Sequence, residues 1–143
     1  MKKCAVLLPL FVIILFTACS SMTFSNESPH QDLPVTGEVT ISIKEDSVSD
    51  TSLILVIKNN TAKELSYDMT YTLERKKDNT WYSLDQDMAF NALAAILKPN
   101  AVNEFPVSWD AKLSKGVYRI VKPVVTENGI CPVAAEFSVG TAK

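Results

Sequence analysis

The chain has 143 residues, of which 47% are hydrophobic and 21% are charged, and its formal net charge is −2 at pH 7. This length suits one compact domain and is short for two. The charges are scattered and slightly acidic in total, which argues against nucleic-acid binding, because that function needs a concentrated positive face.

Residues 1–18 have the layout of a secretory signal peptide. Lys2 and Lys3 form a positive start, and an apolar run follows up to Phe16. The small residues before Cys19 make this segment resemble a bacterial lipoprotein signal, although Phe16 stands where leucine is commonest. That resemblance implies cleavage between Ala18 and Cys19 and attachment of a diacylglycerol, and a palmitate-type chain, to Cys19.

Two alternatives compete with lipidation at the N-terminus. The first is an ordinary secretory signal that is cut nearby, with Cys19 incidental. The second is an uncleaved membrane helix, but the apolar run is only about 14 residues, contains Pro9, and falls short of the ~20 residues that span a bilayer. With lipidation, two acyl chains would anchor the protein stably without a spanning segment.

Residues 19–36 are predicted to form the lipidated N-terminus and a flexible tether. They are rich in Ser, Pro, Asn and Asp and have no apolar period. A segment of about 17 such residues would reach ~23 Å. His30, the only histidine of the chain, lies in this segment, which removes most catalytic and metal-binding hypotheses.

From Gly37 to the C-terminus at residue 143, the sequence predicts a single domain of β-strands. Apolar residues alternate with polar ones or form short buried runs, and turn residues separate the runs. Asp78-Asn79 and Asn128-Gly129 have the chemistry of tight hairpin turns. The predicted strands are 39–43, 53–57, 67–74, 80–84, 105–109, 117–125 and 130–139. Short strands at this spacing predict an all-β, antiparallel sandwich of about seven strands.

The segment 89–97 fits two patterns. Phe90, Leu93, Ala94 and Leu97 follow a helical period, whereas alternate residues from Phe90 to Ile96 follow a strand period. A strand is favoured by the family resemblance below, and a short helix stays open.

No internal disulfide is expected. Cys4 leaves with the signal peptide and Cys19 would carry lipid, so Cys131 is alone. Cys131 alternates with apolar residues of the last strand and is interpreted as a small core residue.

Several motifs of the domain resemble the bacterial immunoglobulin-like domain found in lipoproteins and surface proteins of Gram-positive bacteria. The Tyr71–Trp81 hairpin is similar to its Y-x-hydrophobic-E-K…DG-x-W segment, and Leu97–Asn100 is similar to its L-x-P-G turn. The run from Trp109 to Lys122 resembles its W…L-x-x-G-x-Y-R-I-V-K block, the most specific part. The resemblance covers about residues 51–139 and implies an immunoglobulin-like β-sandwich.

Within this pattern we expect structural roles for Trp81, Trp109, Gly116, Tyr118 and Phe137. Gly116 would supply a permissive backbone at the start of a strand. Tyr118 is placed as in a tyrosine corner, with its ring in the core and its hydroxyl bonded to the preceding loop. On the opposite face, Arg119 is interpreted as a solvated or edge-pairing charge.

The sequence offers no catalytic machinery, so we predict that the protein is not an enzyme and has no cofactor. A nucleophilic serine needs a base, and the one histidine lies in the tether. Zinc needs more Cys or His residues than are present. Asp46, Asp50, Asp85 and Asp87 lack the spacing of a calcium loop, so no metal is expected.

The preferred function is a membrane-anchored, extracytoplasmic and non-catalytic binding module. It would present loops, among them 59–66, 76–80 and 127–129, to a protein, peptide or glycan ligand. The anchor is expected on the outer face of a Gram-positive plasma membrane, or in the outer membrane of a diderm host. One alternative is an immunoglobulin-like proteinase inhibitor, of whose characteristic segment only Tyr67-Asp68 remains. Another is a purely structural envelope component.

Overall fold

The fold was analysed in a computed structural model, which describes residues 22–33, 37–85, 90 and 93–140. The predicted signal peptide, cleavage site and Cys19 lie outside these residues. Within them, every regular element is a β-strand, which confirms the prediction of an all-β fold. The strands are β1 (Phe24–Glu27), β2 (Val39–Ile43), β3 (Ser52–Asn59), β4 (Leu65–Tyr67), β5 (Thr72–Lys77), β6 (Thr80–Leu84), β7 (Ala95–Leu97), β8 (Val102–Ser108), β9 (Gly116–Thr126) and β10 (Gly129–Val139).

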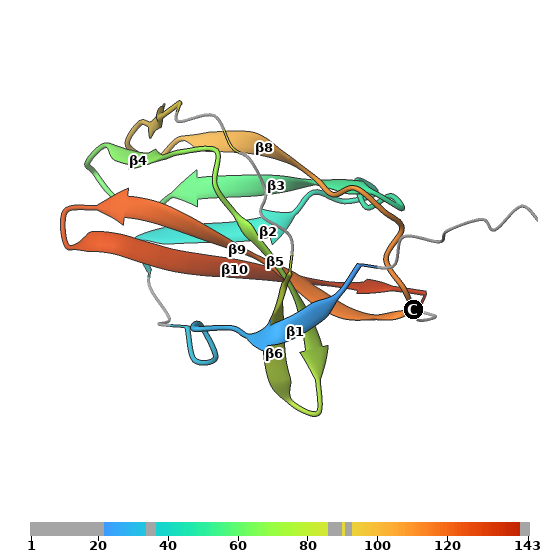
Figure 1. The fold of residues 1–143 in the computed structure, drawn as a ribbon. Coiled ribbons are helices and arrows are strands. Elements are labelled where there is room, and N and C mark those ends of the chain that lie inside the picture. The colour runs from blue at the N-terminus through green and yellow to red at the C-terminus, as the bar shows by residue number, and fades with distance from the viewer. Residues whose placement is uncertain (1–21, 34–36, 86–89, 91–92, 141–143) are drawn as a thin grey trace, which may run out of the picture.

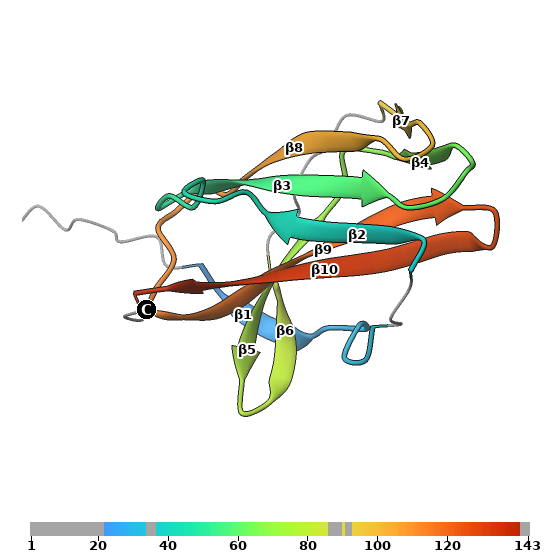
Figure 2. The ribbon, with the colours of Figure 1, turned by 180° about the vertical axis from the view of Figure 1, so that it is seen from behind.

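The strands form two antiparallel sheets that pack face to face. The smaller sheet has the order β2-β3-β8. The larger has the order β1-β6-β5-β9-β4-β7, and β10 pairs with the other edge of β9. β9 is therefore the central strand, and the β5–β6 hairpin, with β1 along it, projects to one side of the β9–β10 pair (Figure 1). Seen from behind, β2 and β3 lie across β9 and β10 (Figure 2).

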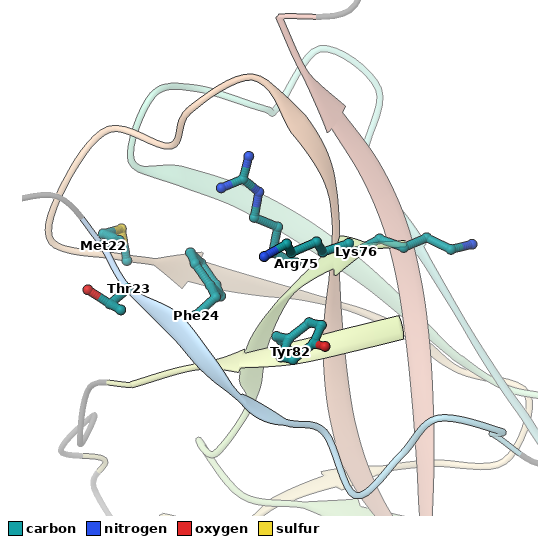
Figure 3. A pocket seen from close by; sticks show the side chains of 7 residues that line it. Met22, Thr23, Phe24, Arg75, Lys76 and Tyr82 are labelled. Carbon is teal, nitrogen blue, oxygen red and sulfur yellow. The ribbon is translucent and has the colours of Figure 1, made fainter. Parts of the chain in front are cut away.

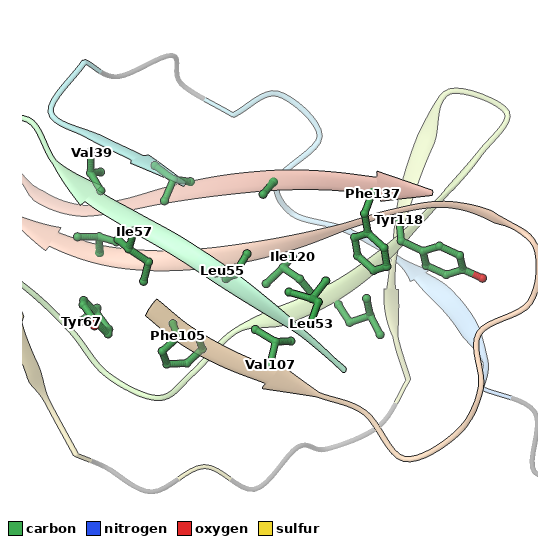
Figure 4. Close-up of a cluster of buried hydrophobic side chains, with 14 of the residues drawn as sticks. Val39, Leu53, Leu55, Ile57, Tyr67, Phe105, Val107, Tyr118, Ile120 and Phe137 are labelled. Carbon is green, nitrogen blue, oxygen red and sulfur yellow. The ribbon is translucent and has the colours of Figure 1, made fainter. Parts of the chain in front are cut away.

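The core lies between the sheets and follows the predicted alternation. In β3 the residues at every second position are fully buried, and β8 supplies their partners from the neighbouring strand. β9 contributes the buried residues that face them across the sandwich (Figure 4). The centre of this core is formed by Leu53, Leu55, Ile57, Phe105, Val107 and Ile120.

Two hairpin turns adopt the backbone that their sequences predict. Asp78 and Asn79, between β5 and β6, have φ angles of 49° and 63°. Positive φ at both central residues is typical of the turn that matches the right-handed twist of paired strands. Gly129, which begins β10, has a φ of 107°, which favours glycine.

The predicted strand 67–74 is interrupted. β4 ends at Tyr67 and β5 begins at Thr72, and both pair with β9. The interruption has a local cause: the carboxylate of Asp68 accepts hydrogen bonds from the backbone N–H and the hydroxyl of Thr70, at 2.8 and 2.5 Å. Such an aspartate turn competes with strand pairing. In the ambiguous segment, Ala95–Leu97 is a strand, while 86–89 and 91–92 lie outside the described residues.

Candidate functional site

A buried ion pair lies on the outer face of the larger sheet. Glu74 of β5 and Arg119 of β9 are register partners, and the Arg119 Nε donates to the Glu74 carboxylate at 2.6 Å. Their side chains are 0% and 5% exposed. The Arg119 guanidinium also stacks over the ring of Trp81, 4.2 Å from its centroid. Arg119 is thus neither the solvated nor the edge-pairing charge that the sequence predicted. It is buried on the central strand β9, where it pairs with Glu74, 45 positions earlier in the chain.

The segment after β1 covers this ion pair. The hydroxyl of Ser28 donates to the second Glu74 oxygen at 2.5 Å, and the carbonyl of His30 accepts from Arg119 at 2.5 Å. Gln31 exchanges two side-chain hydrogen bonds with the backbone of Trp81, at 2.8 and 2.9 Å. These contacts give hydrogen-bond partners to buried polar groups, which would otherwise cost free energy of folding.

β1 is fixed by the carboxylate of Asp85, which follows β6. It accepts the backbone N–H groups of Ser25 and Asn26, and both side chains donate to it as well, at 2.7 and 2.8 Å. These hydrogen bonds, the Ser25 hydroxyl foremost, lower the pKa of Asp85. Residues 22–33 therefore form part of the folded domain, where the sequence predicted a flexible tether. The prediction failed because the partners that hold this polar strand, which are β6, Asp85 and the Tyr118 ring beside Phe24, all lie far along the chain.

Lys122 is a second buried charge that the sequence gave no sign of. Its side chain is 0% exposed, and its Nζ donates to the carbonyls of Asp68 and Thr70 at 2.5 and 2.6 Å. The rings of Tyr67 and Phe105 lie 5.1 and 4.6 Å from the same atom. Burial lowers the pKa of Lys122 to about 8. Since the amine is enclosed by backbone acceptors and aromatic rings, its contacts are those of a structural residue.

Of the five residues predicted to build the core, Trp109, Tyr118 and Phe137 belong to it, whereas Trp81 does not. Tyr118 is fully buried and its hydroxyl donates to the Ser114 carbonyl at 2.8 Å, which confirms the tyrosine corner. Trp109 and Phe137 are buried and stack on each other, with centroids 5.9 Å apart. Trp81 is buried on the other face of the larger sheet, beside the ion pair.

The sequence predicted that position 116 needs the permissive backbone of glycine, but the structure shows a different reason for a small residue there. Gly116 does not have a positive φ. A Cβ there would lie 3.2 Å from Arg75 Nε and 3.4 Å from the Tyr118 ring. A side chain at this position would therefore force the end of the Arg75 side chain to shift by a few tenths of an ångström.

A cavity of about 470 Å³ opens between β1 and the β5–β6 hairpin. Its lining combines basic and amphipathic side chains: Met22, Thr23, Phe24, Arg75, Lys76, Lys77 and Tyr82 (Figure 3). Arg75 is held in place by the Tyr118 ring, 5.7 Å from its centroid, and by one hydrogen bond to the Lys115 carbonyl. We call this site the hairpin pocket.

Two of the three predicted ligand-binding loops meet at the opposite end of the sandwich. An ion pair of 2.5 Å joins Lys63 and Glu127, from the loops 59–66 and 127–129. The third loop, 76–80, is the tip of the β5–β6 hairpin and lies far from them, next to the hairpin pocket (Figure 1).

An apolar row crosses four strands near that loop pair. The register aligns Ile96 of β7, Ser66 of β4, Val125 of β9 and Ile130 of β10. Directly opposed residues of neighbouring strands share a face, so these side chains form one line, about 14 Å long, on the outside of the larger sheet. Its apolar members are 60%, 46% and 74% exposed in strand order. We call them the apolar row.

Of the four aspartates considered for calcium, two have other partners, Asp46 lies in an exposed turn with a φ of 56°, and one lies outside the described residues. Asp50 pairs with Lys112 at 2.9 Å, Asp85 binds β1, and Asp87 is among the residues that are not described. Among the described residues, no group of three His, Cys, Asp or Glu side chains is placed to hold a metal ion. Cys131 has a free thiol and packs, half-buried, against the core. In the same part of the chain, no helix has the length and apolar character to cross a membrane.

Comparison with known proteins defines the family. A model of the bacterial Ig-like domain matches residues 36–138, so the chain belongs to that family. The matched range begins after β1, which makes β1 and the residues that cover the ion pair an addition to the matched domain. Among solved structures, the archaellum periplasmic stator protein FlaG from Sulfolobus acidocaldarius is similar, with a TM-score of 0.44 and 17% identity over 69% of this chain and 99% of that one. A search of curated proteins gave no significant match.

Proposed function

We propose that this protein is a lipid-anchored, extracytoplasmic and non-catalytic module that binds a protein partner through the apolar row. Its membership of the bacterial Ig-like family supports a binding or structural role over catalysis. The lipobox-like residues Thr17, Ala18 and Cys19 support the anchor, which would hold the protein on the outer face of its membrane.

The observation that carries the binding role is the exposure of the apolar row. Isolated surface hydrophobics are common, but here three of them align across one sheet face, with Ser66 between Ile96 and Val125, and clustered exposed hydrophobics are typical of an interaction site. Lys63, Glu127 and Asn128 lie at the end of this sheet and would supply a polar rim. The row also lies at the far end of the sandwich from Met22, the first described residue, so an anchor at Cys19 would leave it accessible (Figure 1).

The inhibitor alternative has less support. The one part of the inhibitor segment that the sequence retains is Tyr67-Asp68. Tyr67 is 5% exposed, and its ring packs on Phe105 and close to Lys122. Asp68 contributes to the turn that follows β4. Tyr67 would therefore not be accessible to a protease, and Asp68, whose side chain is 47% exposed, is held in a turn by its hydrogen bonds to Thr70.

The anchor is tested by labelling cells with radioactive palmitate. The wild type should incorporate label and Cys19→Ala should lose it together with membrane retention, while Cys131→Ala, the matched control, should behave as the wild type. Undiminished labelling of Cys19→Ala would refute the anchor.

The binding role is tested by crosslinking on intact cells with three versions of the chain. A protein crosslinked to the wild type should disappear with Ile96→Asp/Ile130→Asp and persist with Val102→Asp, which changes a 54% exposed residue of the other sheet. The same captured proteins from all three chains would contradict binding through the apolar row.

A further inference from the structure

The hairpin pocket lies next to the proposed lipid anchor. Three peptide units separate Cys19 from Met22, the first residue of its lining, and three units span at most about 11 Å. Since β1 is hydrogen-bonded into the larger sheet, this short distance also limits how far the domain can move from Cys19. A lipid on Cys19 would thus bring the pocket to the level of the membrane surface.

The pocket has the side chains that such a surface requires. Arg75 and Lys77 alternate along β5 and supply two positive charges on one face of the hairpin. The Lys76 Nζ lies on the opposite face, 5.3 Å from the centroid of the Trp81 ring, and adds a third positive charge to the hairpin. Arg75 uses one guanidinium N–H group for the Lys115 carbonyl, so others remain for a phosphate, to which arginine binds with two parallel hydrogen bonds. Phe24 and Tyr82 add aromatic groups of the kind enriched at membrane–water interfaces.

Nearby acidic side chains reduce the positive charge of Arg75, Lys76 and Lys77 but do not cancel it. Glu27 is the register partner of Tyr82, and Asp78 lies at the tip of the hairpin. Neither lines the pocket. Asp85, the third acid of this region, is hydrogen-bonded to Ser25 and Asn26.

We propose that the hairpin pocket docks on the membrane that carries the anchor and binds the phosphate of an anionic phospholipid. The inference rests on the proposed lipid anchor. It adds an orientation: the β5–β6 hairpin faces the bilayer, and the apolar row faces away from it.

The test uses residues 19–143 with Cys131→Ala, so that Cys19 is the single thiol, and couples one acyl chain to it chemically. A single chain binds membranes only marginally, so an added contact is measurable. Each basic residue at an anionic surface contributes about fivefold in affinity. The three basic residues less the acidic Glu27 and Asp78 leave a net charge of +1 here, so partitioning into vesicles with 30% phosphatidylglycerol should exceed that into neutral phosphatidylcholine vesicles by about fivefold.

Charge-matched variants localise the contact. Lys76→Glu/Lys77→Glu should abolish the preference for anionic vesicles, whereas Lys58→Glu/Lys98→Glu, which changes exposed lysines of β3 and of the turn after β7, should retain it. Arg75→Gln should reduce it, with circular dichroism as a check on folding. No preference in the starting protein, or an equal loss in both double variants, would overturn the proposal. Because the acyl chain is attached chemically, these results do not depend on lipidation in cells, which the palmitate experiment tests separately.

Discussion

The buried ion pair of Glu74 and Arg119 allows a quantitative test of what holds the N-terminal segment on the domain. Both side chains are almost completely excluded from solvent, and their 2.6 Å contact is supplemented by Ser28 and the carbonyl of His30. Removing one partner of such a pair leaves an uncompensated buried charge, at a cost of about 3–5 kcal/mol. We therefore expect Glu74→Leu and Arg119→Met each to lower the free energy of unfolding by about that amount.

The double variant Glu74→Leu/Arg119→Met should lose much less free energy of unfolding than the two single variants lose together. It removes both charges. The Ser28 hydroxyl then loses its acceptor but still accepts from the His30 N–H at 3.0 Å, and the His30 carbonyl loses its donor. Each such group costs about 1–3 kcal/mol if it finds no water. The coupling energy between the two sites should thus be about 3 kcal/mol. Urea unfolding followed by the fluorescence of Trp81 and Trp109 measures all four proteins. Additive losses in the double variant would refute the reasoning.

Three further predictions concern buried polar groups. The pKa of Lys122 falls from 10.5 to about 8 on folding, so between these pH values only the unfolded state binds the proton. The free energy of unfolding should therefore rise with pH in this range, by up to about 1.4 kcal/mol per pH unit. The variant Lys122→Met should lack this pH-dependent contribution. Urea titrations from pH 7 to 10 measure it, and equal slopes in both proteins would contradict it. Asn59 is 0% exposed, and its side-chain amide donates to the carbonyls of three residues. Asn59→Ala should therefore lower the free energy of unfolding by about 2–3 kcal/mol. A loss below about 1 kcal/mol in urea unfolding would count against the importance of these hydrogen bonds. Tyr118→Phe removes one hydrogen bond and should cost about 1 kcal/mol in thermal unfolding, whereas an unchanged stability would mean that the corner contributes nothing.

Alternation and turn chemistry were sufficient to predict most of the sandwich. The predicted strand 39–43 coincides with β2, and the Asp78-Asn79 turn joins β5 to β6 as expected. Tyr118 was assigned to a corner from its spacing after Gly116, and its hydroxyl makes the expected bond. These features depend on residues that are close in the sequence, which is why a single sequence reveals them.

The features that the sequence did not predict depend on partners far along the chain. Arg119 is buried because Glu74 and Trp81 lie beside it in the folded sheet. β1 has only four residues, and its attachment depends on Asp85, about 60 positions away. No local pattern of apolar residues marks these contacts, because their partners are brought together only by the folded sheet.

The position of β1 links the fold to the proposed function. A flexible tether of 17 residues would let the domain move freely above a membrane. A strand that begins at Phe24 and pairs with β6 removes that freedom. In consequence, the hairpin pocket and the apolar row would face opposite directions relative to the anchor.

Hydrogen exchange of residues 22–33 tests this arrangement most directly. The backbone N–H groups of Ser25 and Asn26 donate to Asp85, and that of Ser28 donates to the Trp81 carbonyl at 2.9 Å. In the chain from residue 19 onward, these amides should exchange at least about a hundredfold more slowly than in an unstructured peptide, a local opening free energy of about 2.7 kcal/mol or more. Exchange at the rate of an unstructured peptide throughout this segment would show that the domain hangs on a free tether and would contradict the account.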